Sequence, residues 1–143
     1  MLKRMNWLPW SILSALFAAA TALLAKVGVS GISSNLATAI RTLVVLLFAL
    51  SLVLLTYRPG ELSSVSRKGW IFLILSGMAT GMSWLCYFRA LQLGPASKVA
   101  PIDKLSVVFV ILFAAIFLGE DLNALKLAGG ALIAAGAVVL AFS

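Results

Sequence analysis

The chain of 143 residues is 63% hydrophobic and only 10% charged, whereas a soluble domain carries about 25% charged residues, so a soluble fold is excluded. Its formal charge of +7 comes from basic residues scattered between apolar runs, with no dense basic patch, so no nucleic-acid partner is expected. Because the chain has no histidine, one cysteine and only four carboxylates, we expect no enzyme active site, no metal and no cofactor.

Five apolar segments follow one another, each close to the roughly 20 residues that cross about 30 Å of hydrocarbon. The first is expected at residues 7–26 and the second at 34–57. The first resembles a secretory signal, but it is longer than the apolar part of a cleavable signal and further spans follow, so we expect a retained helix. A polar loop with the turn signal Pro59-Gly60 then leads to a third span at 69–91.

The fourth span, at 96–119, is the most irregular of the five. It follows Gly94-Pro95, and its first third holds four residues that are unusual within a span: Lys98, Pro101, Asp103 and Lys104. A polar turn leads to the fifth span at 124–142. The sequence therefore predicts an all-α fold, a polytopic membrane bundle of about five helices that forms one domain over residues 1–143.

Basic residues are unequally shared between the two sides of this topology. The N-terminal side and the loops that lie with it hold Lys3, Arg4, Arg58, Arg67, Lys68 and Lys126, whereas the other side holds Lys26, Lys98 and Arg89. Cytoplasmic loops carry an excess of lysine and arginine. We therefore expect a multi-pass protein of the cell inner membrane, with its N-terminus in the cytoplasm.

Six charged residues from four helices fall in the outer half of the predicted bundle: Lys26, Arg41, Arg89, Lys98, Asp103 and Lys104. A charge at the centre of a span costs roughly 2.5–3.5 kcal/mol on insertion scales, so such charges usually pair or face a water-filled cavity. A basic cavity would bind an anionic or zwitterionic solute. The alternative for Arg41 is that its side chain reaches outward to the interface. Asp103 either binds a proton or pairs with Arg41, Arg89 or Lys104.

Prolines and glycines mark the structural candidates. Pro95 and Pro101 flank the charged part of the fourth span, and Pro101 either exposes backbone to a polar cavity or only kinks the helix. Gly77 and Gly81 form a GxxxG pair that permits close helix packing. Aromatic residues continue this region of the third span, and either they pack or Trp84 and Tyr87 contact the apolar part of a solute.

Three stretches resemble the EamA-type half of the drug/metabolite transporter superfamily: residues 87–102 (YFRALQLGPASKVAPI), Leu118-Gly119-Glu120, and residues 129–136 (GGALIAAG). Arg41-Thr42 also matches this family, so the resemblance covers nearly the whole chain. The resemblance implies a half-size member of a fold built from two five-helix halves in opposite orientation. Such proteins move small metabolites, often amino acids, by alternating access.

The resemblance also implies a partner, either an antiparallel second copy or an oppositely oriented sister half, in contact with the lipid bilayer. Glu120 matches a Gly-Glu pair of the family and is expected to form a structural ion pair or cap. The small multidrug resistance family uses a carboxylate in its first helix, which this chain lacks, so export of lipophilic cations is disfavoured.

The expected function is therefore transport, and more specifically export, of small anionic or zwitterionic metabolites. Two alternatives stay open. The first is an accessory membrane subunit that does not transport, and the second is a flippase for a phosphate-bearing lipid.

Overall fold

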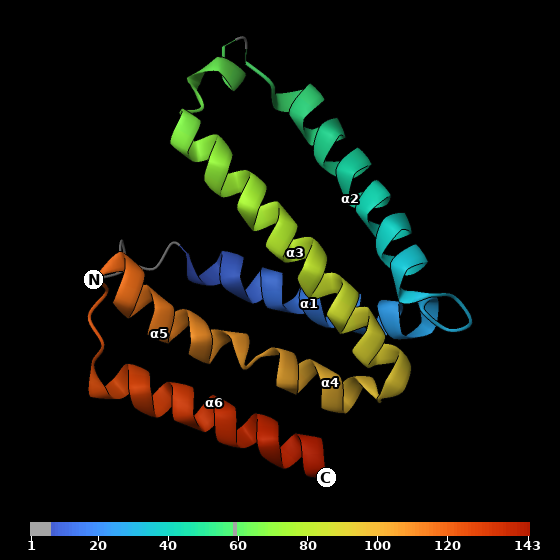
Figure 1. Cartoon of the computed structure of the whole chain (residues 1–143), viewed down its shortest axis with the longest axis vertical. Coiled ribbons are helices and arrows are strands. Elements are labelled where there is room, and N and C mark those ends of the chain that lie inside the picture. Colours follow the sequence, from blue (N-terminus) through green and yellow to red (C-terminus); the bar gives the residue numbers. More distant parts are fainter. Residues whose placement is uncertain (1–6, 59) are drawn as a thin grey trace. The chain divides into compact units, whose positions relative to one another are not determined.

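The computed structural model describes residues 7–58 and 60–143, and throughout this part of the chain the regular structure is helical (Figure 1). Lys3, Arg4 and Pro59, which entered the sequence predictions, lie outside the described residues. The elements in chain order are α1 (Leu8–Gly28), α2 (Ser34–Thr56), the short 3-10 helix η2 (Leu62–Ser64), α3 (Arg67–Leu93), α4 (Ala96–Asp103), α5 (Ser106–Leu118) and α6 (Ala124–Phe142).

Five of these stretches are long and apolar enough to cross a membrane, with α4 and α5 counting together as the span Ala96–Leu118. The shortest, α6, has 19 residues and is about 28 Å long at 1.5 Å per residue, close to the thickness of the hydrocarbon layer. The predicted all-helical class and the predicted number of spans are confirmed. The observed ends lie within two residues of the expected ones.

Most large apolar side chains of the spans are exposed in the single chain, as at Leu54 and Leu55, which are 82% and 83% exposed. A lipid bilayer can solvate this much exposed apolar surface, because lipid tails are as apolar as leucine. The protein is therefore a multi-pass membrane protein whose helices face lipid or another protein over most of their surface.

Helix ends are fixed by local side-chain and backbone contacts. At the start of α2 the Ser33 hydroxyl accepts a hydrogen bond from the Leu36 amide at 3.2 Å, and at the start of α6 the Asn123 side chain accepts one from the Lys126 amide at 2.9 Å. Both are N-caps that satisfy amides without a partner inside the helix. Gly119 ends α5 with a φ of +69°, a left-handed conformation that favours glycine.

The fourth span is interrupted between α4 and α5. The amides of Lys104 and Leu105 donate to the carbonyls of Pro101 and Ile102, three residues back, at 3.1 and 3.0 Å. This 3-10 spacing is tighter than the α-helical one. Pro101, the predicted cause of a kink or of exposed backbone, lies inside α4. The break between α4 and α5 lies about one turn after it.

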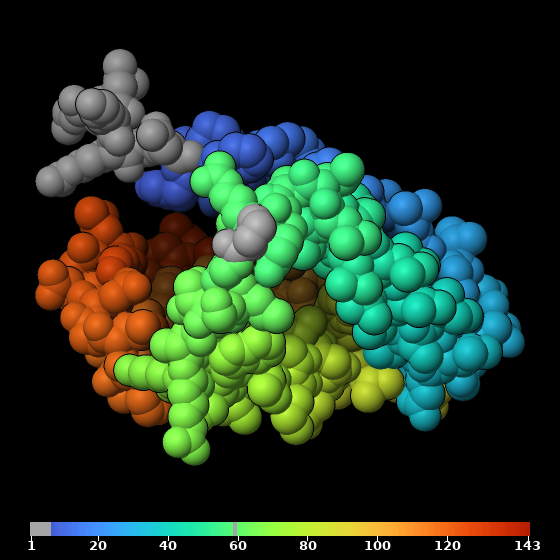
Figure 2. Space-filling view, turned by 90° about the horizontal axis from the view of Figure 1, so that it is seen from above, coloured from blue at the N-terminus to red at the C-terminus, as the bar shows by residue number. Residues whose placement is uncertain are grey.

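The described chain forms two compact units, which we describe separately. Unit 1 comprises residues 7–27 and 93–143, and in it α6 packs against both α4 and α5. Small residues make this packing close: Gly130 of α6 is buried, and a Cβ atom there would lie 3.6 Å from the Ile111 side chain. Unit 2 comprises residues 28–58 and 60–92, and therefore holds α2, η2 and α3 up to Gln92. Figure 2 looks onto the end of unit 2 where α2 connects to α3, drawn in green.

Candidate functional site

The charged residue deepest in a span of unit 2 is Arg41, which lies seven residues, or about 10 Å, beyond the start of α2. Its guanidinium carbon Cζ is 4.4 Å from the centroid of the Trp84 ring and 5.4 Å from that of Phe88. Trp84 and Phe88 are four residues apart on α3, so their rings stand on neighbouring turns of one face. We call these three residues the arginine site. Phe88 is only 2% exposed, and the other two are half-buried.

Both rings contact the guanidinium as a cation–π pair, in which the cation is attracted to the electron-rich face of the ring. A guanidinium in cation–π contact keeps its N–H groups, which are arranged as a fork that fits a carboxylate or phosphate. Among the described residues of unit 2, the contacts of the Arg41 guanidinium are with these rings, and neither a hydrogen bond nor an ion pair joins it to another residue of the unit. The arginine site therefore offers an oriented set of donors to an oxyanion.

Tyr87 belongs to the same neighbourhood. Its ring centroid lies 6.5 Å from that of Phe88, with the planes tilted by 49°, so Tyr87 adjoins the arginine site through Phe88. Three predicted site residues, Arg41, Trp84 and Tyr87, thus lie in one neighbourhood of unit 2. The contact of Phe88 with Arg41 is not predicted from the sequence.

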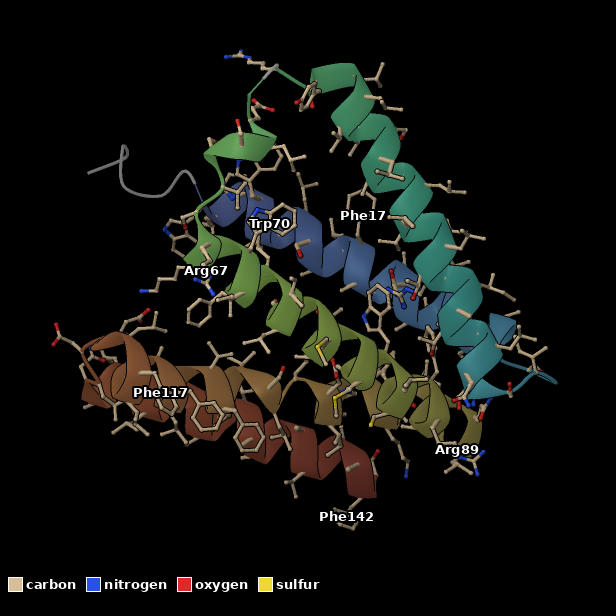
Figure 3. All side chains as sticks on the ribbon, turned by 45° about the horizontal axis from the view of Figure 1, so that its top comes forward. Phe17, Arg67, Trp70, Arg89, Phe117 and Phe142 are labelled. Atoms are coloured by element: carbon tan, nitrogen blue, oxygen red, sulfur yellow. The ribbon has the colours of Figure 1, made fainter. Side chains whose placement is uncertain are left out.

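A polar contact lies at the end of α3 beyond the arginine site. Arg89 Nη1 donates to Gln92 Oε1 at 3.2 Å, and Gln92 Nε2 donates to the carbonyl of Ile32 at 2.7 Å. Figure 3 shows Arg89 at this end of α3, with Arg67 and Trp70 at the other. Arg89 is a predicted solute ligand, and in the structure its guanidinium donates to a side chain of its own helix. Gln92 was not singled out from the sequence.

The remaining predicted charges lie in unit 1 and have different partners. Lys26 Nζ donates to the Gly94 carbonyl, next to Pro95, at 2.8 Å, and Lys98 Nζ donates to the main-chain oxygen of Ser143. Asp103 Oδ2 pairs with Lys104 Nζ at 3.3 Å. Both of these side chains are substantially exposed, and exposed pairs of this kind contribute about 0–1 kcal/mol. Within unit 1, Lys26, Lys98 and the Asp103–Lys104 pair thus each have a contact in the described part of the chain, and their predicted role as a basic cluster stays a prediction.

The predicted packing glycines are open. A Cβ atom at Gly77 or Gly81 would meet nothing within 4 Å, so neither glycine packs closely against another described part of unit 2. The predicted packing role therefore stays a prediction about a neighbouring molecule. Cys86, the one cysteine of the chain, is exposed and is offset by two residues from both Trp84 and Phe88, which places it on the other side of α3.

Glu120 follows the left-handed Gly119 at the end of α5. Its Oε2 accepts from Lys126 Nζ at 3.4 Å, and its amide donates to the Ala114 carbonyl at 3.2 Å, which helps to close the end of α5. Both side chains of the ion pair are exposed. The arrangement has the local geometry of a cap and contains no contact suited to a solute.

Comparison with known proteins gives the chain a family context. Residues 5–142 match the model of the EamA-like transporter family. A protein of Sinorhizobium sp., described as an uncharacterised transporter in the cobO 3′ region, is 53% identical over 136 residues, which cover 95% of this chain and 96% of that protein. The pseudopaline exporter CntI of Pseudomonas aeruginosa is 37% identical over 57 residues, or 40% of this chain and 20% of the exporter. No solved structure matches.

Proposed function

This chain belongs to the EamA-like transporter family, as its resemblance predicted, and we propose that it exports small anionic or zwitterionic metabolites such as amino acids. That it is a membrane transporter follows from the family match, the similarity to a protein named as a transporter, and the five membrane-length helices. The solute class, the direction and the mechanism are the proposal.

The arginine site is the observation on which the solute class rests. A guanidinium inside a membrane span is costly, and such charges are found where they pair or face a polar cavity. The Arg41 guanidinium lies over the Trp84 and Phe88 rings, and its N–H groups remain as donors for a solute oxyanion. A carboxylate would bind the edge as a charge-assisted pair, and the half-buried Trp84 and Tyr87 would contact the apolar part of the same solute.

The length of the chain supports its working as one half of a transporter. The 57 residues shared with the Pseudomonas exporter are 40% of this chain and 20% of the exporter, so the exporter is about twice as long. We infer that two five-helix halves, either two antiparallel copies or this chain and a sister half, enclose the pathway and expose it alternately to the two sides. The name of the Pseudomonas protein also agrees with the outward direction.

The proposal is tested by efflux from proteoliposomes that contain the purified protein and are loaded with a mixture of amino acids, each followed by mass spectrometry. Replacing Arg41 by glutamine removes the charge and should lower efflux about tenfold or more, because a hydrogen bond to a charged group contributes about 1.5–3 kcal/mol. Arg67→Gln is the matched control, since it removes an arginine of the same unit that lies at the far end of α3. Equal efflux by Arg41→Gln and the unmodified protein would refute the assigned site.

A further inference from the structure

Gln92 connects two segments of unit 2 that lie far apart in the sequence. Its amide group uses both of its ends: Nε2 donates to the Ile32 carbonyl at 2.7 Å and Oε1 accepts from Arg89 at 3.2 Å. The bond to Ile32 is partly buried and joins residues 60 positions apart. Gln92 thereby ties the loop before α2 to the end of α3.

The anchored carbonyl lies at the point where α2 begins. Ile32 directly precedes Ser33, the N-cap of α2, and it directly follows Gly31, whose φ is +79°. A fixed carbonyl at Ile32 therefore fixes where the first turn of α2 starts. Arg41 lies on the same continuous helix about 10 Å beyond that start, so the position of Arg41 along α3 depends on where α2 begins.

Three residues of α3 contact α2 or the loop ahead of it: Trp84, Phe88 and Gln92. They lie on successive helical turns, because they follow one another at intervals of four residues. The two rings contact the guanidinium of Arg41, and the amide contacts the chain ahead of α2. Residues four apart on a helix are neighbours on one face. One stripe of α3 therefore determines both where α2 begins and where its arginine lies.

We propose that Gln92 is a positioning residue for the solute-binding arginine, and this inference rests on the proposed function. Gln92 holds α2 in register with α3, so that the guanidinium stays over Trp84 and Phe88 with its N–H edge directed to the solute. Gln92 does not contact the solute itself.

The chemistry of the amide makes the inference specific. Methionine has nearly the same length as glutamine but provides neither a strong donor nor a strong acceptor, so Gln92→Met removes both bonds at nearly constant volume. Glutamate keeps the acceptor for Arg89 but cannot donate to the Ile32 carbonyl when ionised. Both variants should therefore disturb the arginine site, whereas only Gln92→Met should also release Arg89.

The first readout needs no solute. In a protein that carries Trp7→Phe, Trp10→Phe and Trp70→Phe, the only remaining tryptophan is Trp84, and its emission reports whether the guanidinium lies over the ring. Gln92→Met and Gln92→Glu should both shift this emission toward that of Arg41→Gln. Thr80→Ala is the control, because it removes a side-chain hydrogen bond that stays within α3.

The second readout is efflux of the amino-acid mixture from proteoliposomes, measured over a range of loading concentrations. Both Gln92 variants should raise the half-saturating concentration about threefold to tenfold, with the maximum rate within about twofold of the unmodified protein. A general loss of folding would lower the maximum rate and the yield of monodisperse protein instead.

The two proposals fail in different ways. If both Gln92 variants leave the Trp84 emission and the half-saturating concentration unchanged while Arg41→Gln abolishes efflux, Gln92 has no positioning role and the arginine site stands. If Arg41→Gln leaves efflux unchanged, the proposed solute site is wrong whatever the Gln92 variants do to the emission.

Discussion

The contact between Arg41 and Trp84 should stabilise the folded protein. A double-mutant cycle measures the contribution of this contact to the free energy of unfolding. The single variants are Arg41→Gln, which removes the charge, and Trp84→Leu, which removes the ring but keeps an apolar side chain. Each variant alone also changes burial and helix propensity. We compare the change in the free energy of unfolding caused by the double variant with the sum of the changes caused by the two single variants. The difference between these two values is the coupling free energy of the two side chains.

The expected coupling follows from the geometry. Cation–π pairs contribute about 0.5–1 kcal/mol at exposed sites and about 2 kcal/mol or more when they are desolvated. Arg41 and Trp84 are half-buried, and the guanidinium carbon lies 4.4 Å from the ring centroid. We therefore expect a coupling of about 1–1.5 kcal/mol. Phe88 remains in contact with Arg41 in the Trp84 variant, so the value refers to one ring only.

The assay is unfolding of the purified protein in mixed micelles with increasing denaturing detergent, followed by circular dichroism. The chain offers a matched control pair in Lys68 and Phe72, whose Nζ-to-centroid distance is 5.9 Å and whose ring is 61% exposed. Its coupling should be at most about 0.5 kcal/mol. A coupling near zero for Arg41 and Trp84, or one no larger than in the control pair, would refute the reasoning.

Two further predictions concern topology and assembly. Reporter fusions should place the N-terminus in the cytoplasm and the C-terminus outside, because Arg58, Arg67 and Lys68 gather in and beside the α2–α3 connection, and a C-terminus in the cytoplasm would contradict this. Gly77→Leu and Gly81→Leu should leave the yield of folded chain within about twofold, because a Cβ atom at either position meets nothing within 4 Å. The same variants should reduce crosslinking between chains, and unchanged crosslinking would exclude this face from the assembly.

The fold was largely predictable because membrane spans are set by one physical length. An apolar stretch has to match the hydrocarbon layer, so the start and end of each apolar run fix a helix to within a residue or two. The break in the fourth span was harder to place. Pro101 indicates that the hydrogen-bond ladder is disturbed, but the structure takes up the disturbance at Lys104 and Leu105, and this depends on how the neighbouring turns tighten.

The candidate site was only partly predictable, because depth along a span says nothing about how the helix is rotated. Arg41, Trp84 and Tyr87 were recognised one by one as unusual or amphipathic residues inside spans. The contact of Arg41 with Trp84 depends on how α2 and α3 approach each other near Arg41, and no local pattern encodes that approach. The available sequence signal for Gln92 is its place one turn after Phe88 on the same face of α3. The sequence alone does not show that it reaches the carbonyl of Ile32.

The interruption of the fourth span also affects how the chain enters the membrane. The apolar helix α5 has 13 residues and is about 20 Å long, and α4 has eight residues, including charged ones. Neither piece alone matches a hydrocarbon layer of about 30 Å, and charged residues within a span weaken its partitioning from the translocon. Because α6 packs against both pieces, we expect Ala96–Phe142 to insert into the membrane as one helical hairpin. The span formed by α4 and α5 then becomes stable in the membrane only after α6 has inserted.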